Sequence, residues 1–501
     1  MIFVAELTAA VGSEGILQTF YITTGNGFIT KPSDSPANTN VYPRLLDPGT
    51  YSRALFSGSK VFGAVRPSFG SVVISNPDGL FDIWKTYGFD GQSFILRIGE
   101  EGGDYPSSFS TVFKCTMTSI KLTERDVTVN LSDRLSMLDK PVLNRPLLGT
   151  GGVEGTSDMA GEMLPRAFSD PGWIPLKLLD SSNLIYAVQA ESTGGLGTSV
   201  QLYDGGVEVI KEADYSSVSD LLANPPSAGN CRIYHGGPTY IRIGTPPTYD
   251  LRVYTMGYKV SGPAYKYADL AIEAGVTDAV IEASLPVYGL YVDDASTTYM
   301  DVLDESCKVS LSYYGFDRLD VFRSGFVVPT PTSPVYSFNR NNCISISRTS
   351  PDFQEVPTYN LTISSGQTWP CRVAEGATTR MKDYLTRQNW FSTLSYQDDL
   401  MLDRHKLAKS DIIEMKYRIP NSHTFDNIRK SYMNMFGVER DQVMIECLLT
   451  EENYVALLSL DIMSSVEVKM PRFGFDEGKT FKIISMSYKL SSNRLEFILW
   501  G

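Results

Sequence analysis

Short apolar runs separated by turn residues dominate the chain and predict a mainly β protein. Residues 2–9 and 16–24 are two such runs, and the glycine- and serine-containing segment between them is typical of a hairpin turn. Over 126–131, valine and leucine alternate with polar residues, which predicts a strand with one buried face and one solvated face. Similar runs occur at 69–76, 93–99, 111–121 and 125–132. We expect these strands to close a barrel or a sandwich that ends near Leu143.

The composition changes after this first block. Residues 144–165 are rich in glycine and threonine, which is typical of a linker or a long loop. One helix is expected over 216–223, because it is followed by an Asn-Pro-Pro sequence that ends helices. Short strands are expected around 184–188, 200–203 and 240–243. We interpret this block as a small inserted domain.

Helical spacing of apolar residues appears in the second half of the chain. The pattern predicts helices over 264–274 and 297–312, the second with Ser296 as its N-cap. A further helix is expected over 424–436, ending at Gly437 as its C′ residue. The apolar stripe of the second helix is Met300, Leu303, Cys307 and Leu311.

The remaining segments divide into connectors and strands. Residues 328–335 contain three prolines and predict a stiff connector, whereas residues 380–410 are polar and are expected to be irregular. A hairpin is expected over 313–322. Further strands are expected at 343–348, 358–364, 443–449, 465–470, 480–489 and 494–499.

These elements predict a multidomain fold that is mainly β with minor α, built from tube-like β-barrel domains plus small α+β domains. The length of 501 residues suggests three or four domains. The expected division is an N-terminal tube-like barrel (1–145), an inserted small β-rich domain (146–265), a helix-plus-β domain (266–415) and a C-terminal helix-plus-barrel domain (416–501).

An aromatic-Gly-aromatic-Asp sequence occurs three times, at 87–90, 314–317 and 473–476, each time before an apolar run. Two interpretations are open. The repeats are traces of duplicated barrel units, or the same four residue types suit the entry to a hairpin and arose independently.

Composition and charge narrow the class of function. Hydrophobic residues make up 42% and charged residues 20%, which is typical of a globular chain. The formal net charge of −13 argues against a surface that grips nucleic acid or anionic lipid, because such surfaces gather positive charge. No apolar run is long enough for a membrane helix, and the first six residues lack the basic segment of a signal peptide. We expect folding in a cytoplasm.

The cysteines show no metal-binding or disulfide pattern. The nearest two are 28 residues apart, so no CxxC pair exists. In a large chain that is not secreted, disulfides are not expected, and we interpret all six as small core residues. They are Cys115, Cys231, Cys307, Cys343, Cys371 and Cys447.

The three histidines, His235, His405 and His423, lack the spacing of a metal helix. His405 follows three aspartates, so a carboxylate–imidazole site is conceivable there, although a solvated loop explains the same residues. The glycine-rich stretch at 149–155 departs from a dinucleotide-binding pattern, because Glu154 occupies the last required glycine position.

Paired carboxylates could serve a glycosidase as acid and nucleophile. The candidates are Asp293 with Asp294 and Asp398 with Asp399, but neighbours on a strand point to opposite faces, so neither pair alone forms a dyad. We therefore predict no enzyme activity, no catalytic, cofactor-binding or metal site, and no cofactor. The sequence alone does not identify the residues of a partner interface.

The end of the chain carries the most specific pattern. A strand pattern at 465–470 precedes the sequence PRFG at 471–474, and the last strand closes in Leu-Trp-Gly at 499–501. This ending resembles that of minor tail proteins of long-tailed bacteriophages and prophages. The sequence departs from that family's pattern at 460–466 and 380–410. Similar segments, in the family's order, cover nearly the whole chain: 1–8, 21–28, 42–45, 72–79, 87–91, 131–134, 138–141, 203–207, 213–215 and 313–319.

The resemblance implies a structural hub protein of a phage tail tip or baseplate. In such hubs two tube-like barrels lie in one chain, and three chains present six barrels to the tail tube. This implies a homotrimer around a channel through which phage DNA passes without specific binding. Its implied neighbours are distal tail or tail tube proteins on one side and tail fibre or tip proteins on the other. The implied location is the virion tail, assembled in the bacterial host cytoplasm.

Two other functions stay open. One is a receptor- or glycan-binding tail-tip module that uses the aromatic residues of 166–265. The other is a polysaccharide or cell-wall hydrolase that uses carboxylates distant in sequence. In every case we expect Trp500 to be buried, because an exposed terminal Leu-Trp would present a large apolar surface.

Overall fold

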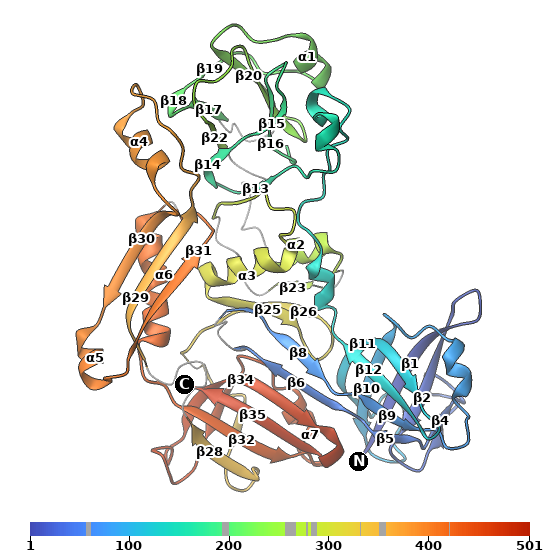
Figure 1. The fold of residues 1–501 in the computed structure, drawn as a ribbon. Coiled ribbons are helices and arrows are strands. Elements are labelled where there is room, and N and C mark those ends of the chain that lie inside the picture. Colours follow the sequence, from blue (N-terminus) through green and yellow to red (C-terminus); the bar gives the residue numbers. More distant parts are fainter. Residues whose placement is uncertain are drawn as a thin grey trace.

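The computed structural model describes residues 1–56, 62–192, 200–255, 267–276, 279–281, 288–330, 332–349, 357–419 and 421–501. These residues form seven sheets and several short helices, so the fold is mainly β with minor α, as the sequence predicts. Figure 1 shows the N- and C-terminal sheets side by side, a helical layer above them and the inserted block at the far end.

The N-terminal sheet contains the predicted hairpin, in which β1 pairs antiparallel with β2. The end strands of this sheet, β3 and β5, are not hydrogen-bonded to each other within the described residues, so the sheet does not close into the expected barrel. The physical reason is that the chain leaves this sheet after β5 and pairs elsewhere. In sheet order the strands are β3 (Phe28–Ile29), β4 (Asn40–Tyr42), β2 (Ile16–Thr23), β1 (Ile2–Val11), β10 (Ser93–Gly99), β11 (Ser110–Leu122), β12 (Asp126–Ser132), β9 (Val72–Ser75) and β5 (Leu45–Asp47).

The C-terminal sheet recruits strands from three parts of the chain. Strand β34 pairs with β33 along its first residues and with β6 along its last residues, where Tyr51 lies opposite Tyr488. This sheet is also open, because β27 and β28 are its edges in the described structure. In sheet order the strands are β27 (Tyr336–Phe338), β33 (Ser465–Val468), β34 (Lys479–Lys489), β35 (Arg494–Trp500), β32 (Gln442–Leu448) and β28 (Ser345–Thr349), with β6 (Thr50–Ala54) and β8 (Arg66–Phe69) attached to β34; α7 (Tyr454–Leu458) lies between β32 and β33 in the chain.

A helical layer with its own small sheet lies between these two sheets and the inserted block. Helix α3 (Tyr299–Ser310) begins at Thr298, whose side chain accepts a hydrogen bond from the Asp301 N–H in a capping box. The predicted N-cap, Ser296, is therefore wrong, and its hydroxyl instead donates to Asp294. The other elements are α2 (Tyr267–Ala274), β23 (Ala279–Ile281), β26 (Phe322–Phe326), β25 (Ser312–Phe316) and β7 (Gly63–Ala64); the part of the predicted helix at 264–266 lies outside the described residues.

The inserted block contains the predicted short strands and the predicted helix, which begins at the N-cap Ser217. Its strand β13 (Arg166–Phe168) pairs with β24 (Leu290–Val292), which lies beyond the block in the chain. A second sheet has the order β14 (Gly172–Pro175), β22 (Leu251–Thr255), β17 (Gln201–Asp204) and β18 (Val207–Glu208). A third has the order β15 (Lys177–Asp180), β16 (Ile185–Gln189), β21 (Thr239–Ile243), β20 (Asn230–Tyr234) and β19 (Ile210–Lys211), with α1 (Val218–Ala223) nearby in the chain.

Residues 380–410 are ordered, so the prediction of an irregular segment is wrong. They contribute to a three-stranded sheet whose central strand, β29 (Thr358–Gln367), pairs antiparallel with β30 (Trp390–Gln397) and parallel with β31 (Lys409–Met415). The helices of this region are α4 (Thr379–Thr386), α5 (Asp399–Arg404) and α6 (Ser422–Phe436). Helix α6 ends at Gly437 as expected, but this residue has φ −83° and is a C-cap rather than a left-handed C′ residue.

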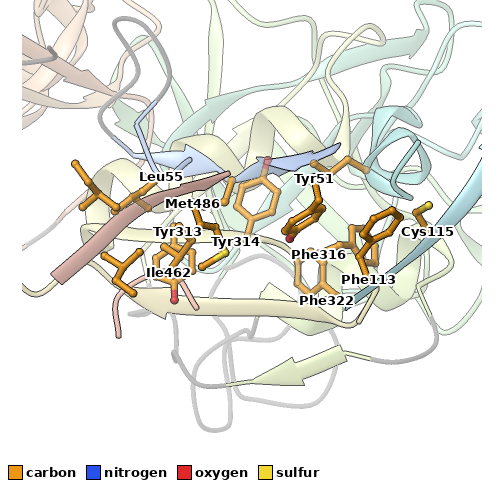
Figure 2. Packing of buried hydrophobic residues seen from close by; sticks show 14 of the residues in the cluster. Tyr51, Leu55, Phe113, Cys115, Tyr313, Tyr314, Phe316, Phe322, Ile462 and Met486 are labelled. Carbon is orange, nitrogen blue, oxygen red and sulfur yellow. The ribbon is translucent and has the colours of Figure 1, made fainter. Parts of the chain in front are cut away.

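One continuous apolar core joins the N-terminal sheet, the helical layer and the C-terminal sheet. In Figure 2, Tyr51 and Phe113 from the first part of the chain lie beside Phe316, and Ile462 and Met486 lie close by. Trp500 is fully buried in this core, which confirms that prediction. The proposed domain boundaries stay a prediction, and the pairings of β6 with β34 and β7 with β25 cross them.

The short 3-10 helices connect these elements: Asp82–Thr86, Leu135–Asp139, Gly152–Glu154, Ser157–Met159 and Leu490–Ser492.

Candidate functional site

The histidines lie on three separate elements. His235 directly follows β20, and its Nε2 is 3.3 Å from a carboxylate oxygen of Asp214. His405 follows α5, and its Nε2 is 3.9 Å from a carboxylate oxygen of Glu439. His423 is in the first turn of α6, where its backbone N–H donates to Asn421. Within the described part of the chain, no three His, Cys, Asp or Glu side chains form a group that could hold a metal ion.

The candidate carboxylates cap turns and helices. Asp294 accepts hydrogen bonds from the backbone and hydroxyl of Ser296, while burial raises the pKa of Asp293. Asp398 is the N-cap of α5 and accepts from two backbone N–H groups, and Asp399 accepts from Gln397. These bonds satisfy the ends of secondary structure, which is an ordinary role for aspartate.

The glycine-rich stretch also closes on itself. The Glu154 carboxylate accepts a hydrogen bond from Arg145 at 2.5 Å and from the Leu148 N–H at 3.2 Å. The residue that departs from the dinucleotide-binding pattern therefore bonds within its own segment and holds this loop in place.

The three-stranded sheet offers a different kind of site, because both of its outer strands are open. Strand β29 has a partner on each side, and its Leu361 and Ile363 are buried in the core that also contains Phe425 and Ile428 of α6. Strands β30 and β31 each have one partner among the described strands. Their backbone groups along the outer edges can therefore pair with another chain.

Large apolar side chains lie exposed on these edge strands, on helix α5 between them and on the turn that follows this helix. Leu400 and Leu407 are each 80% exposed, Ile412 is 73% exposed and Tyr396 is 40% exposed. We name these four residues the open-edge patch. Figure 1 shows β30 and α5 on one outer flank of the molecule, whereas β31 lies on the side of the same sheet that faces α3. These residues are spread over both edges of the sheet, and Tyr396 and Ile412 lie on opposite faces, because they pair with the adjacent residues Leu361 and Thr362 of β29. Exposed large apolar residues on open edges are typical of interaction surfaces.

A cleft of about 1040 Å³ runs between the β31 edge and helices α3 and α6. Most of the charged side chains that line this cleft are acidic. On the α3 side the carboxylates are already bonded, since Asp304 accepts from the Tyr314 hydroxyl at 2.9 Å and Glu305 accepts from the Lys416 N–H at 3.0 Å. Its charged lining consists of Asp294, Asp301, Asp304, Glu305, Asp411, Glu414, Lys308, Lys409 and Lys416.

The segment at 460–466, where the sequence departs from the family pattern, contacts the start of the chain. Asp461 accepts a hydrogen bond from Arg53 of β6 at 2.5 Å, and the Arg53 side chain is only 1% exposed. This loop also borders a second cleft of about 640 Å³ beside β26. The departure thus marks a contact between the first and last parts of the chain.

The sequence did not predict the open-edge patch, because residues 380–410 lack a clear period. The available signals were local: Asp398 before a short apolar run is a helix start, and Ile412 and Ile413 favour a strand. Among the described residues, no helix is both long enough and apolar enough to cross a membrane.

Comparison with solved structures finds tail proteins among the similar chains, with low identity. A tail protein from Neisseria meningitidis MC58 is 10% identical, with a TM-score of 0.40, and the alignment covers 90% of this chain and 91% of that chain. The 43 kDa tail protein of prophage MuSo2 from Shewanella oneidensis is 10% identical, with a TM-score of 0.42 and coverage of 100% and 98%. A chain in the virion of a native gene transfer agent particle is 11% identical, with a TM-score of 0.41 and coverage of 73% and 88%. No family model and no curated protein matches the sequence.

Proposed function

We propose that this chain is a structural hub protein of a phage tail tip or baseplate. It joins the tail tube or distal tail ring to the tip or fibre proteins and surrounds the channel for DNA. The observation that carries this proposal is the three-stranded sheet with two open edges and the exposed open-edge patch. Such a surface makes a monomer prone to aggregate, whereas in an assembly a neighbouring chain covers it and gains binding energy.

The two open edges favour a ring of identical chains. The β30 edge and the β31 edge are different surfaces, so contact between one and the other is heterologous, and a rotation that closes gives a ring. We propose a ring of three, because the order of sequence motifs resembles a family whose hubs are trimers. The net charge of −13 supports a channel that repels DNA, since like charges disfavour adhesion.

The test is the mass of the purified chain in solution, measured by light scattering alone and with tail tube or distal tail proteins. The proposal expects a trimer, alone or with a partner. Ile412→Lys should shift the mass toward the monomer, because it places a charge on the open edge of β31.

Ile210→Lys is the matched control, because Ile210 is 69% exposed on β19, which is also an edge strand. It should leave the mass unchanged. A monomer that binds no tail protein would contradict the hub and direct attention to binding of cells or glycans. Equal dissociation by both variants would contradict the assignment of the interface to the open-edge patch.

A further inference from the structure

Two cysteines lie in contact at the edge of the C-terminal sheet. Cys447 is on β32, and Cys343 lies just before β28, the edge strand that pairs with β32. Their sulfur atoms are 3.7 Å apart, although the residues are 104 positions apart in sequence. A disulfide bond needs about 2.05 Å, so the two sulfurs must approach by somewhat under 2 Å. Because Cys343 precedes the strand rather than lying within it, rotation of its side chain can supply this movement.

The two thiols have different accessibility and different acidity. Cys343 is partly exposed, whereas Cys447 is buried. The Cys447 thiol donates to the Cys343 sulfur, which lowers the pKa of Cys343. Burial raises the pKa of Cys115, Cys231 and Cys371 instead. The thiolate is the form that attacks disulfides, so the more accessible member of the pair is also the better nucleophile.

We propose that Cys343 and Cys447 form an intramolecular disulfide when the protein meets a low-molecular-weight disulfide outside the reducing cytoplasm. The Cys343 thiolate attacks one sulfur of the oxidant, and the oxidant's disulfide bond breaks to release one thiolate. Cys447 then loses its proton and attacks the Cys343 sulfur of the mixed disulfide, which releases the second thiolate. Two electrons pass from the two cysteines to the oxidant, which leaves as two thiols once it has taken up the two protons.

The bond would fasten the module that carries the open-edge patch. All of β29, β30, β31, α4, α5 and α6 lies between positions 343 and 447. The disulfide would therefore tie both ends of this module to one point of the C-terminal sheet. It would also hold β28, which among the described strands pairs with β32 alone. Cross-links that close long loops restrict the unfolded chain most. The expectation that the protein leaves the cytoplasm rests on the proposed function. The reactivity of Cys343 with Cys447 does not depend on that function.

The experiment uses the full chain, purified under reducing conditions and then exposed to oxidised glutathione. Remaining thiols are blocked with a maleimide, and the digested protein is mapped by mass spectrometry without reduction. We expect the six thiols of the chain to fall by two, and a peptide that joins positions 343 and 447. Cys343→Ser should abolish this peptide, and Cys371→Ser, at the other half-buried cysteine, should leave it.

The proposal would be overturned if no thiol were lost on oxidation. It would also be overturned if glutathione stayed attached to Cys343 without a cross-link, or if the cross-linked peptide joined a different pair of cysteines. Thermal unfolding of wild type before and after oxidation gives a second measurement that does not depend on any variant. The oxidised chain should melt at a higher temperature, and Cys343→Ser should show no gain. A cross-link without a gain would overturn its role in fastening the module.

Discussion

The buried ion pair between Arg53 and Asp461 shows how much one residue contributes to joining distant parts of this chain. The guanidinium is almost fully buried, and Asp461 contacts one of its nitrogens at 2.5 Å. The other two nitrogens, Nε and Nη2, have no hydrogen-bond partner within the described structure. A buried charge without its partner is expensive, so this pair is required once Arg53 is buried.

We predict that Asp461→Asn lowers the free energy of unfolding by roughly 3 kcal/mol, because Arg53 keeps its charge and loses its counter-ion. Urea unfolding followed by fluorescence measures the change. Asp78→Asn is the control, because Asp78 is 55% exposed in its pair with Arg44 and solvent screens that pair, so the loss should be much smaller. Equal effects of the two substitutions would show that burial of Arg53 does not decide the cost.

Asp133 gives a pH-dependent prediction at the same scale. Burial raises its pKa from 3.8 to about 6. Between these two pH values, the folded chain keeps a proton on Asp133 that the unfolded chain has released. This carboxyl therefore favours folding below its unfolded pKa, and that contribution is lost as pH rises through about 4 to 6. We predict that Asp133→Asn is more stable than wild type at pH 7 and loses this advantage at pH 4. Urea midpoints at the two pH values test it, and a constant difference would contradict the assignment.

At the scale of elements, the sequence predicted those with a clear period and missed those without one. Helix α6 and the last strands follow regular apolar spacing and were predicted closely. Residues 380–410 form short helices and edge strands that are exposed on most sides. Because few of their side chains are buried, their apolar residues show no regular spacing in the sequence. The aromatic-Gly-aromatic-Asp repeats lie in two turns and one strand, which favours their independent origin.

The start of α3 shows that a local rule could have predicted more. Ser296 and Thr298 are both suitable N-caps, but only Thr298 has an acidic residue three positions later to complete a capping box. We predict that Thr298→Ala lowers the free energy of unfolding by about 1 kcal/mol, because the Asp301 N–H loses its acceptor. Ser296→Ala should have a smaller effect. Urea unfolding compares them, and the reverse order would contradict the observed cap.

At the scale of the whole molecule, the pairing of distant strands could not be predicted. Alternation shows that one face of 50–54 is buried but does not show that its partner is β34. The open-edge patch was missed for a related reason, since exposure of an edge depends on which strands lie beside it. The same limit applies to Cys343 and Cys447, whose contact follows from the pairing of β28 with β32.

We predict that a chain ending at residue 415 fails to assemble into tails. It lacks β32, β33, β34 and β35, so β6, β27 and β28 lose strands with which they pair. It also opens the continuous core around Tyr51. Soluble yield and electron microscopy of tails made with the truncated chain test this, and tails of normal appearance would contradict it.

The pairing of β6 with β34 also has a consequence in time. Arg53 and its partner Asp461 are 408 residues apart, and ribosomes add about 5–20 residues per second. Strand β6 therefore leaves the ribosome tens of seconds before its final partner exists. During that interval its antiparallel pairing with β8, which starts at Arg66, can cover one edge. We expect folding to be slow and to finish only after translation has nearly ended, because its decisive contacts join the first and last segments to be synthesised.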